Sequence, residues 1–344
     1  MNQESSPVKR LDSPAEPVGI LIVGHGSPRT EANRGFQAMV TRVAARLGEA
    51  AILPTFFSIT EPDIPERVAT LVEGGAQRIL LLPYFLYSGQ HVTVDIPALL
   101  DQCRQRFPGV TLEMLPTLEN DPALEDLVVE RLTPLVDRQA ALPSDAGGIE
   151  RRSYEIIDRQ LGDWGPADPG MRQIVRRVVH ATADISFART LRIHPRAVER
   201  GRQALAERRP IVCDVKMLQA GMTKIRGEIL CAIDGAEAAA LAQARGGTRA
   251  AAAMELLAPR LEGAIVAVGN APSALWKVME LARQGGPRPA LVVGLPVGLV
   301  GAREAKQVLL ESDLCYITNV GPRGGSPVAA AAVNALAMLE RKES

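Results

Sequence analysis

The chain has 344 residues, more than one ordinary domain holds and enough for two separate hydrophobic cores. Lysine plus arginine and aspartate plus glutamate both total 39, so no net charge draws the protein toward nucleic acid or an anionic membrane. Aromatic residues make up only 3%, which argues against a stacking platform for nucleic acid. The 4 cysteines are far apart and form no C-x-x-C pair, which is typical of reduced thiols in a cytoplasmic protein.

The beginning of the chain is polar and contains prolines, without the apolar segment of a signal peptide. We expect residues 1–17 to be a disordered leader. The best candidate for a membrane span, residues 290–302, is too short and is interrupted by Pro296 and several glycines. We therefore expect a soluble, cytoplasmic protein that binds no membrane.

From Val18 onward, short apolar runs alternate with segments of helical periodicity. Strands are expected at 18–24, 51–57, 78–86 and 110–115, and helices at 31–47, 66–73, 94–106 and 122–135. The apolar runs are continuous, as in strands that are buried on both faces. This pattern predicts a parallel sheet flanked by helices in a first domain at 18–137, with ligands at the carboxyl ends of the strands.

A second alternating region follows a stretch rich in turn formers. Residues 138–150 are expected to be a linker, and residues 151–340 a second domain. In this domain we expect strands at 210–215, 228–233, 264–269, 290–298 and 315–320, and helices at 197–207, 248–257, 273–283, 304–310 and 327–339. The two regions share no repeat, so the prediction is two different α/β domains.

Two of the chain's four histidines follow predicted strands of the first domain. His25 lies in GHGSPR after the first strand, and His91 lies in PYFLYSGQHVTVDIP after the third. In a parallel sheet both positions face the same crevice, so two imidazoles can converge there and hold a divalent metal loosely enough to pass it on. The alternative is that each is an ordinary polar residue at a strand end.

His180 stands where a helical pattern meets a break of small residues, in RRVVHATADISFA. Met171, Ile174 and Val178 recur upstream at helical spacing. Imidazole titrates near neutrality, so it can donate or accept a proton in catalysis. The alternative is a structural histidine at a helix C-terminus, where the macrodipole favours a cation. His194, which precedes a proline, is interpreted as structural.

The glycines around His25 do not form a nucleotide site. Gly24 and Gly26 lack the third glycine of the dinucleotide fingerprint, and no G-K-[ST] follows them. We therefore expect no nucleotide cofactor.

The first domain resembles the small-type sirohydrochlorin cobaltochelatases. The resemblance rests on GHGS at His25 and PYFLYSGQHVTVDIP at His91, and it covers about residues 18–135. It implies that the two histidines bind the metal and help to insert it into the macrocycle, so that cobalt is a substrate metal. The family includes iron- and nickel-inserting relatives, which these motifs do not separate. A single domain of half length implies a site completed by a second copy, and so at least a homodimer.

Residues 152–339 resemble the precorrin-8X methylmutases. The ordered segments that match are SYEII, VVHAT, PIVCDVKM, GMTKIR, GGTRAAAAM, VGNAPSAL, GLPVGLVGAREAK and GGSPVAAAAVNAL. The resemblance implies that His180 is the catalytic acid, which protonates the tetrapyrrole and promotes migration of a methyl group from C11 to C12.

Further residues are expected to bind the carboxylate-fringed macrocycle. Arg249, Thr223 and Lys224 match positions around the substrate by resemblance, although Lys224 stands where the family pattern has Arg. The loops VGNAP and GPRGGSP offer small residues and backbone N–H groups after strands; the alternative for each is turn chemistry alone. The expected substrate-binding residues are Thr223, Lys224, Arg249, Asp214, Gly269, Asn270, Gly324, Gly325 and Ser326.

Together these features predict a bifunctional enzyme of cobalamin biosynthesis. It would insert cobalt into sirohydrochlorin and isomerise (cobalt-)precorrin-8 to (cobalt-)hydrogenobyrinate or cobyrinate. The alternatives are a methylmutase joined to an iron or nickel chelatase, and a tetrapyrrole-binding carrier whose chelatase domain is idle. The expected partners are the tetrapyrroles sirohydrochlorin and cobalt-precorrin-8, with no nucleic acid.

Overall fold

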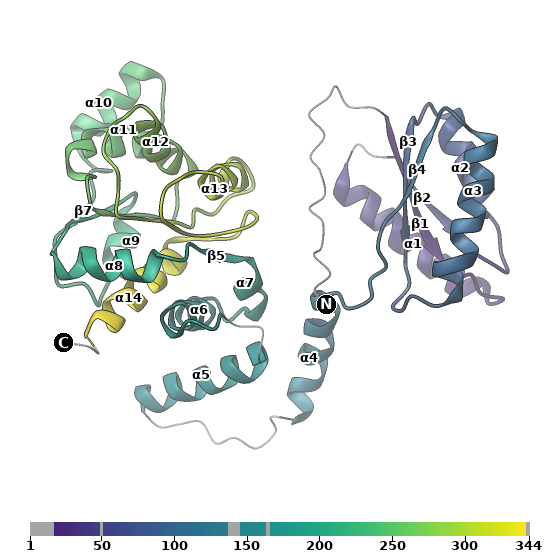
Figure 1. Cartoon of the computed structure of the whole chain (residues 1–344), viewed down its shortest axis with the longest axis horizontal. Helices are drawn as coiled ribbons and strands as arrows, with labels where there is room; N and C mark the ends of the chain where they lie inside the picture. The colour runs from purple at the N-terminus through teal and green to yellow at the C-terminus, as the bar shows by residue number, and fades with distance from the viewer. Residues whose placement is uncertain (1–16, 49–50, 137–144, 163–165, 342–344) are drawn as a thin grey trace. The chain divides into compact units, whose positions relative to one another are not determined.

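The computed structural model describes residues 17–48, 51–136, 145–162 and 166–341. The expected leader falls almost entirely outside these residues, as does the first half of the expected linker. The chain divides into two compact units, residues 1–138 and 139–344 (Figure 1). None of the helices in the described ranges has the length and apolar character needed to cross a bilayer.

The N-terminal unit is a four-stranded parallel sheet with helices on both faces. Its strands are β1 (Val18–Gly24), β2 (Ala51–Phe56), β3 (Arg78–Pro83) and β4 (Thr111–Met114). Its helices are α1 (Thr30–Leu47), α2 (Ile64–Glu73), the π-helical turn η1 (His91–Asp95), α3 (Ile96–Arg106) and α4 (Pro122–Val136). The strand order is β2-β1-β3-β4, so the expected parallel sheet is confirmed.

Alternate residues of the central strand β1 enter opposite cores. Leu21 and Val23 are fully buried with residues of α2 and α3, whereas Ile22 packs with Val40 of α1 on the other face. A strand buried on both sides needs an unbroken apolar sequence, which explains the run VGILIVG. The sheet therefore gives a rigid base for the loops at its carboxyl edge.

The C-terminal unit is a six-stranded sheet in the order β5-β10-β9-β8-β6-β7, in which only β5 is antiparallel to its neighbour. The strands are β5 (Leu191–Ile193), β6 (Ile211–Cys213), β7 (Ile229–Leu230), β8 (Ile265–Val268), β9 (Leu291–Gly294) and β10 (Tyr316–Asn319). The chain reverses direction across the sheet between β6 and β8. Ligands of open α/β sheets bind at such a switch point, beyond the carboxyl ends of the strands.

Helices cover both faces of this second sheet. One face carries α5 (Ala146–Leu161), α6 (Pro169–Thr182), α7 (Ile185–Thr190), α8 (Ala197–Ala206), α9 (Lys216–Gly221) and α14 (Ser326–Arg341). The other carries α11 (Arg249–Leu256), α12 (Pro272–Arg283) and α13 (Ala302–Leu310), with α10 (Ala236–Arg245) and the 3-10 turn η3 (Ala258–Arg260) beside them. Two α/β units with different sheets confirm the expected fold class.

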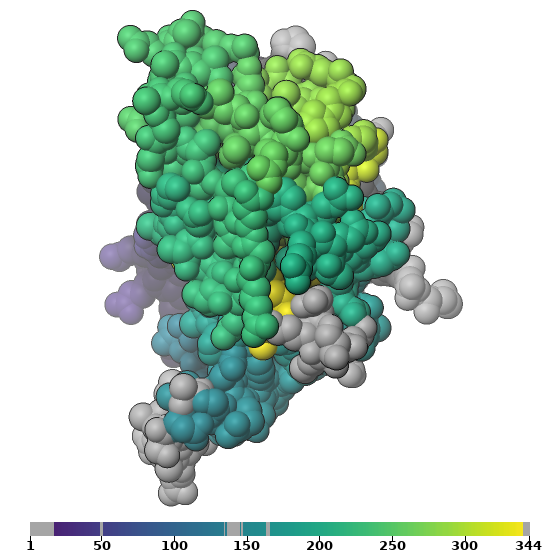
Figure 2. All heavy atoms as spheres, turned by 90° about the vertical axis from the view of Figure 1, so that its left-hand side faces the viewer, coloured from purple at the N-terminus to yellow at the C-terminus, as the bar shows by residue number. Residues whose placement is uncertain are grey.

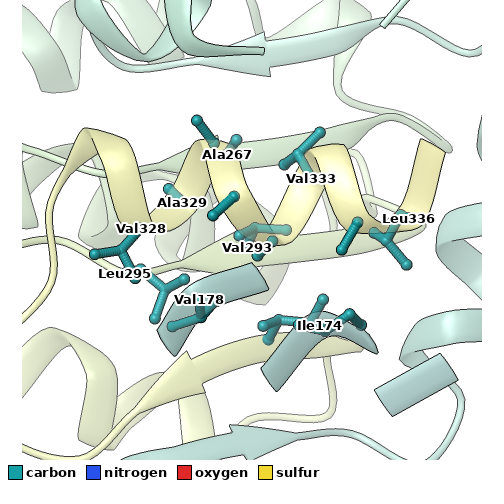
Figure 3. Packing of buried hydrophobic residues seen from close by; sticks show 14 of the residues in the cluster. Ile174, Val178, Ala267, Val293, Leu295, Val328, Ala329, Val333 and Leu336 are labelled. Carbon is teal, nitrogen blue, oxygen red and sulfur yellow. The ribbon is translucent and has the colours of Figure 1, made fainter. Parts of the chain in front are cut away.

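Helix α14 is the centre of the larger core. Its side chains Val328 and Leu336 pack over the sheet, and α6 lies beneath with Val178 and Ile174 (Figure 3). Val178 lies nearer Val328 and Ile174 nearer Leu336, so the two helices run in opposite directions (Figure 3). On the face shown in Figure 2, small areas of the yellow C-terminal segment are visible between green and teal segments. The antiparallel packing brings the end of α6 to the beginning of α14.

Three local expectations need correction. Helix α5 begins at Ala146, inside the expected linker, because Asp145 caps it by accepting a hydrogen bond from Gly148 N–H at 2.7 Å. Strand β3 ends at Pro83 and not at residue 86: Tyr84 and Leu86 are exposed on a loop, while Phe85 packs against the core. The helix expected from residue 94 is α3, which begins at Ile96 after the π-helical turn.

Candidate functional site

His25 and His91 meet at the carboxyl edge of the first sheet. His25 follows the last residue of β1, and His91 opens the turn η1, eight residues after β3 ends. Their ring centroids lie 5.3 Å apart, and Phe57 packs against His91 with its ring centroid 4.5 Å away. The expected convergence of two imidazoles is therefore present, and both side chains are exposed to a ligand.

Both imidazoles are oriented through the same ring nitrogen. His91 Nδ1 lies 2.8 Å from Asp95 Oδ2, one helical turn further on, and His25 Nδ1 lies 3.2 Å from the Gly26 carbonyl oxygen. An N–H donated from Nδ1 to these acceptors leaves the Nε2 lone pair for a metal ion. Two imidazoles at this separation can share one ion, and imidazole suits divalent cobalt, nickel, iron and zinc.

Exposed apolar side chains surround this histidine pair. Ile59, Tyr87 and Val94 are 62%, 76% and 55% exposed, on the loops after β2 and β3 and on η1. A soluble domain rarely gathers large apolar groups at a polar site unless a ligand or partner covers them. In the described part of the chain, no group of three or more His, Cys, Asp or Glu residues is placed to hold a metal ion.

His180 occupies the last turn of α6. Asp168 starts this helix by accepting a hydrogen bond from Met171 N–H at 2.7 Å, and Ala183 ends it in the left-handed conformation with φ 51°. Ser153 of α5 holds His180 Nδ1 through its Oγ at 2.8 Å. The other ring nitrogen, Nε2, is therefore the one that can transfer a proton.

Behind His180, an arginine of α6 is bound to α5. Arg177 forms an ion pair with Glu150 and donates to the Tyr154 hydroxyl oxygen at 3.0 Å. Tyr154 in turn donates to Glu150 at 3.1 Å, and its ring meets the His180 ring edge-on at 5.7 Å. Burial raises the pKa of Tyr154, so the phenol stays protonated and keeps donating to Glu150.

The His180 side chain faces a cavity of about 480 Å³. The cavity walls come from α5, the end of α6 and the start of α7, and they are mostly apolar. The lining residues are Ile149, Arg152, Ser153, Ile156, Ile157, Gln160, Val179, His180, Ala183 and Ile185. A proton donor at an apolar wall with one arginine suits an apolar ring system that carries carboxylates.

Asp214 is not the substrate contact that we expected. It follows β6, is completely buried, and accepts three backbone hydrogen bonds, from the N–H groups of Gly269 (3.1 Å), Asn270 (2.8 Å) and Ala271 (2.7 Å). Burial raises the pKa of Asp214, and the three donors oppose that rise. The carboxylate therefore anchors the loop at the switch point, and the N–H groups expected to bind a ligand are already occupied.

The glycines of the two expected loops serve close packing. A Cβ on Gly269 would lie 2.8 Å from the Ser326 Cα, and one on Gly324 would lie 2.3 Å from the Leu295 carbonyl oxygen. Ser326 and Gly325 are buried, and Gly325 N–H donates to Leu295. These contacts join the loops after β8, β9 and β10 into one surface, so these small residues have a packing role, and their contact with the substrate stays a prediction.

An ion pair and hydrogen bonds connect this surface to the turn that follows His180. Arg323 forms an ion pair with Asp184 and donates to Ser186 Oγ at 3.0 Å, and its guanidinium lies over the Phe187 ring at 5.2 Å. Lys306, which is 1% exposed, donates to the Arg323 carbonyl oxygen at 2.6 Å. The buried lysine and the arginine thus fix the loop after β10 against the end of α6. Sequence reasoning missed both residues.

Two of the expected substrate residues remain exposed at the carboxyl edge. Arg249 is the first residue of α11, whose N-cap Thr248 hydrogen-bonds Ser273 of α12 at 2.7 Å, and Asn270 is exposed beside it at the start of α12. Both can therefore reach a ligand there.

Thr223 and Lys224 lie elsewhere. Lys224 N–H donates to the Asn334 side chain of α14 at 3.0 Å, eight residues past the start of that helix. Lys224 lines a cavity of about 570 Å³, together with Arg208, Arg209 and Arg226, whose lining contains neither His180 nor Asn270. Among the described residues, the Lys224 cavity and the His180 cavity therefore share no lining residue.

Comparison with known proteins relates each unit to a family. Residues 148–339 match the family model described as precorrin-8X methylmutase, and residues 19–135 match the CbiX family model. The chain is 40% identical over 200 residues to the precorrin-8X methylmutase of Pseudomonas aeruginosa, a match that covers 56% of this chain and 95% of the relative. It is 38% identical over 196 residues to the cobalt-precorrin-8 methylmutase of Priestia megaterium, covering 56% and 87%.

A solved structure gives the same result for the fold. The precorrin-8X methylmutase of Thermus thermophilus superposes with a TM-score of 0.53 at 36% identity, over 58% of this chain and 98% of the other. The two units thus define an enzyme in which a CbiX domain is joined to a methylmutase domain, as the sequence predicted. The chain belongs to the precorrin-8X methylmutase family, whose model matches more than half of its length.

Proposed function

We propose that the C-terminal unit moves a methyl group from C11 to C12 of precorrin-8 or cobalt-precorrin-8, giving hydrogenobyrinate or cobyrinate. The observation that supports this most directly is His180, held by Ser153 at 2.8 Å on the wall of an apolar cavity. In the reactive state the imidazolium donates Nδ1–H to the Ser153 oxygen and Nε2–H to the macrocycle. Proton transfer withdraws electrons from the ring and promotes the shift, and the product then returns the proton.

Incubation of the full-length chain with the methyl-shift substrate tests this proposal. We expect the absorption spectrum to change to that of the product, with a rate proportional to enzyme concentration. The relatives include both precorrin-8X and cobalt-precorrin-8 methylmutases. The same assay with the metal-free and with the cobalt-containing substrate therefore shows which substrate this enzyme converts. Stoichiometric binding without turnover would instead support a tetrapyrrole carrier.

Ser153→Ala is expected to lower the kcat of this reaction by about 10–100-fold, because a hydrogen bond from a charged donor contributes about 1.5–3 kcal/mol. The imidazole keeps its place on α6 but loses its fixed orientation, so KM should change little. Steady-state kinetics separate the two effects, and Ser153→Thr, which restores a hydroxyl, should recover most of the rate. An unchanged kcat in Ser153→Ala would remove Ser153 from the mechanism.

We also propose that the N-terminal unit inserts a divalent metal, cobalt first among the candidates, into sirohydrochlorin. The support is the pair His25 and His91, whose Nδ1 atoms are both engaged and whose rings lie 5.3 Å apart at an exposed apolar rim. The Nε2 atoms hold the substrate metal over the macrocycle, and the free imidazoles can then accept the protons that leave its pyrrole nitrogens.

The double substitution His25→Ala, His91→Ala is expected to reduce the enzyme-dependent rate of cobalt insertion by more than about 100-fold, since both metal ligands are lost and removing only a hydrogen-bond partner of a ligand already costs about 10–100-fold. The absorbance change on metallation, corrected for the spontaneous rate, measures it, with His194→Asn in the other unit as the matched control. Parallel assays with iron and nickel identify the preferred metal. Equal rates for the double variant and the unaltered protein would show that the histidines are structural.

A second copy of the chain completes this proposal. The His180 cavity and the Lys224 cavity have separate linings in one chain, although both belong to the expected substrate site. Pairing of two copies would let the cations of one chain neutralise carboxylates of a macrocycle at His180 of the other. We therefore propose at least a homodimer, which analytical ultracentrifugation with and without product can measure.

A further inference from the structure

Cys213 and Cys231 are neighbours on adjacent parallel strands. Strands β6 and β7 pair Ile211 with Ile229 and Val212 with Leu230, so the next step of the register sets Cys213 opposite Cys231. Adjacent strands lie about 4.7–4.9 Å apart, which falls within the range of about 4.4–6.8 Å that a disulfide spans between Cα atoms. Opposed residues of parallel strands point to the same face, so the two sulfur atoms face each other.

The two thiols differ in reactivity. Cys213 is 1% exposed, whereas Cys231 is half-buried and can be reached by a small molecule. The neighbouring Cys213 thiol lowers the pKa of Cys231 to about 7, and the nearby Lys216 ammonium adds to this, its Nζ lying 3.2 Å from the Cys231 carbonyl oxygen. The neighbouring Cys231 and burial raise the pKa of Cys213. The pair therefore holds one nucleophilic thiolate and one buried thiol.

We propose that Cys213 and Cys231 form a reversible disulfide by exchange with a low-molecular-weight disulfide, and that this modification slows the methyl-shift reaction. The Cys231 thiolate attacks the small disulfide RSSR, forming Cys231–S–S–R and releasing RS⁻. Cys213 then loses its proton and attacks the Cys231 sulfur, releasing a second RS⁻. Two protein thiols are oxidised, RSSR is reduced to two thiols, and the two protons pass to them.

The position of the pair connects this chemistry to the site. Cys213 immediately precedes Asp214, whose carboxylate anchors the N–H groups of Gly269, Asn270 and Ala271. A disulfide removes the thiol hydrogen that Cys213 donates to the Val215 carbonyl oxygen at 3.7 Å, and it links the ends of β6 and β7 covalently beside that anchor. The loop at the switch point then moves with Asp214. This part of the proposal rests on the proposed methylmutase function.

Treatment of the full-length protein with glutathione disulfide tests the modification independently of any activity. We expect the loss of two hydrogens in intact mass and a Cys213–Cys231 cross-link in the peptide map, both reversed by dithiothreitol. Cys213→Ala should stop at a mixed disulfide on Cys231, and a Cys103→Ala, Cys315→Ala double variant should still form the cross-link. In the unaltered protein, iodoacetamide should label Cys231 at least about tenfold faster than Cys315, whose pKa burial raises to about 11.

Absence of the cross-link in the unaltered protein, or equal labelling of Cys231 and Cys315, would overturn the proposal even if the variants fail to fold. If the cross-link forms and the methyl-shift rate falls by at least about threefold and returns with dithiothreitol, the regulatory part stands as well. A cross-link with an unchanged rate contradicts the regulatory part alone. A protein that forms the cross-link but shows no methylmutase activity in either state contradicts the proposed function, not the modification.

Discussion

His180→Ala is expected to lower the kcat of the methyl shift by about 10²–10⁴-fold, the contribution of a positioned general acid. The side chain lies at the end of α6, beside Ala183 in the left-handed conformation, and makes one hydrogen bond, to Ser153. Its removal therefore deletes the proton donor with little effect on the core formed by Ile174 and Val178. Product affinity should stay within about threefold, because the carboxylate-binding groups remain.

Single-turnover kinetics measure the rate of the methyl shift, and a titration with product on the same preparation measures the product affinity. His194→Asn is the matched control: its imidazole accepts a hydrogen bond from Arg196 N–H at 3.1 Å and is absent from the lining of the His180 cavity. The tryptophan fluorescence of the His180→Ala protein, which comes from the C-terminal unit alone, should remain unchanged, which shows that this unit is folded. A variant that retains full activity would assign the proton transfer to another group.

The sequence predicted the parallel strands and their carboxyl-end histidines well because both depend on local patterns, whereas the short antiparallel strand β5 was not predicted. Unbroken apolar runs such as VGILIVG are required wherever a strand is covered on two faces, and the residues that follow such a strand lie at the carboxyl edge of the sheet. The end of β3 was predicted wrongly because Tyr84 and Leu86 continue the apolar run while lying on an exposed loop. Apolar character there serves a surface and not a core.

The site around His180 in the C-terminal unit was predicted less well, because it depends on contacts between residues that are distant in the sequence. Asp214 looks like a polar residue at a strand end, and only the fold shows that residues 269–271, more than fifty positions later, donate to it. Ser153 and His180 are 27 residues apart, and no spacing rule joins them. Conversely, Asp95 could have been found, since a histidine and an aspartate four residues apart share a helix face.

Asp214→Asn is expected to lower the free energy of unfolding of the C-terminal unit by about 2–4 kcal/mol. The carboxylate accepts from three backbone N–H groups, two at Oδ2 and one at Oδ1. An amide has one acceptor oxygen, so its NH₂ group must face at least one N–H donor in a buried site that water does not reach. The loop would loosen where α12 begins, and the kcat of the methyl shift should fall with it.

Urea unfolding followed by tryptophan fluorescence measures this effect in the intact chain. Both tryptophans, Trp164 and Trp276, belong to the C-terminal unit, so the signal reports on that unit alone. Trp276 lies on α12, the helix whose first turn Asp214 anchors. The control is Asp313→Asn: this side chain is 80% exposed, and its surface ion pair with Arg288 should contribute about 1 kcal/mol or less. If Asp214→Asn lowers the free energy of unfolding no more than Asp313→Asn does, the buried carboxylate does not hold the loop. The proposed connection between the cysteine pair and the active site would then fail as well.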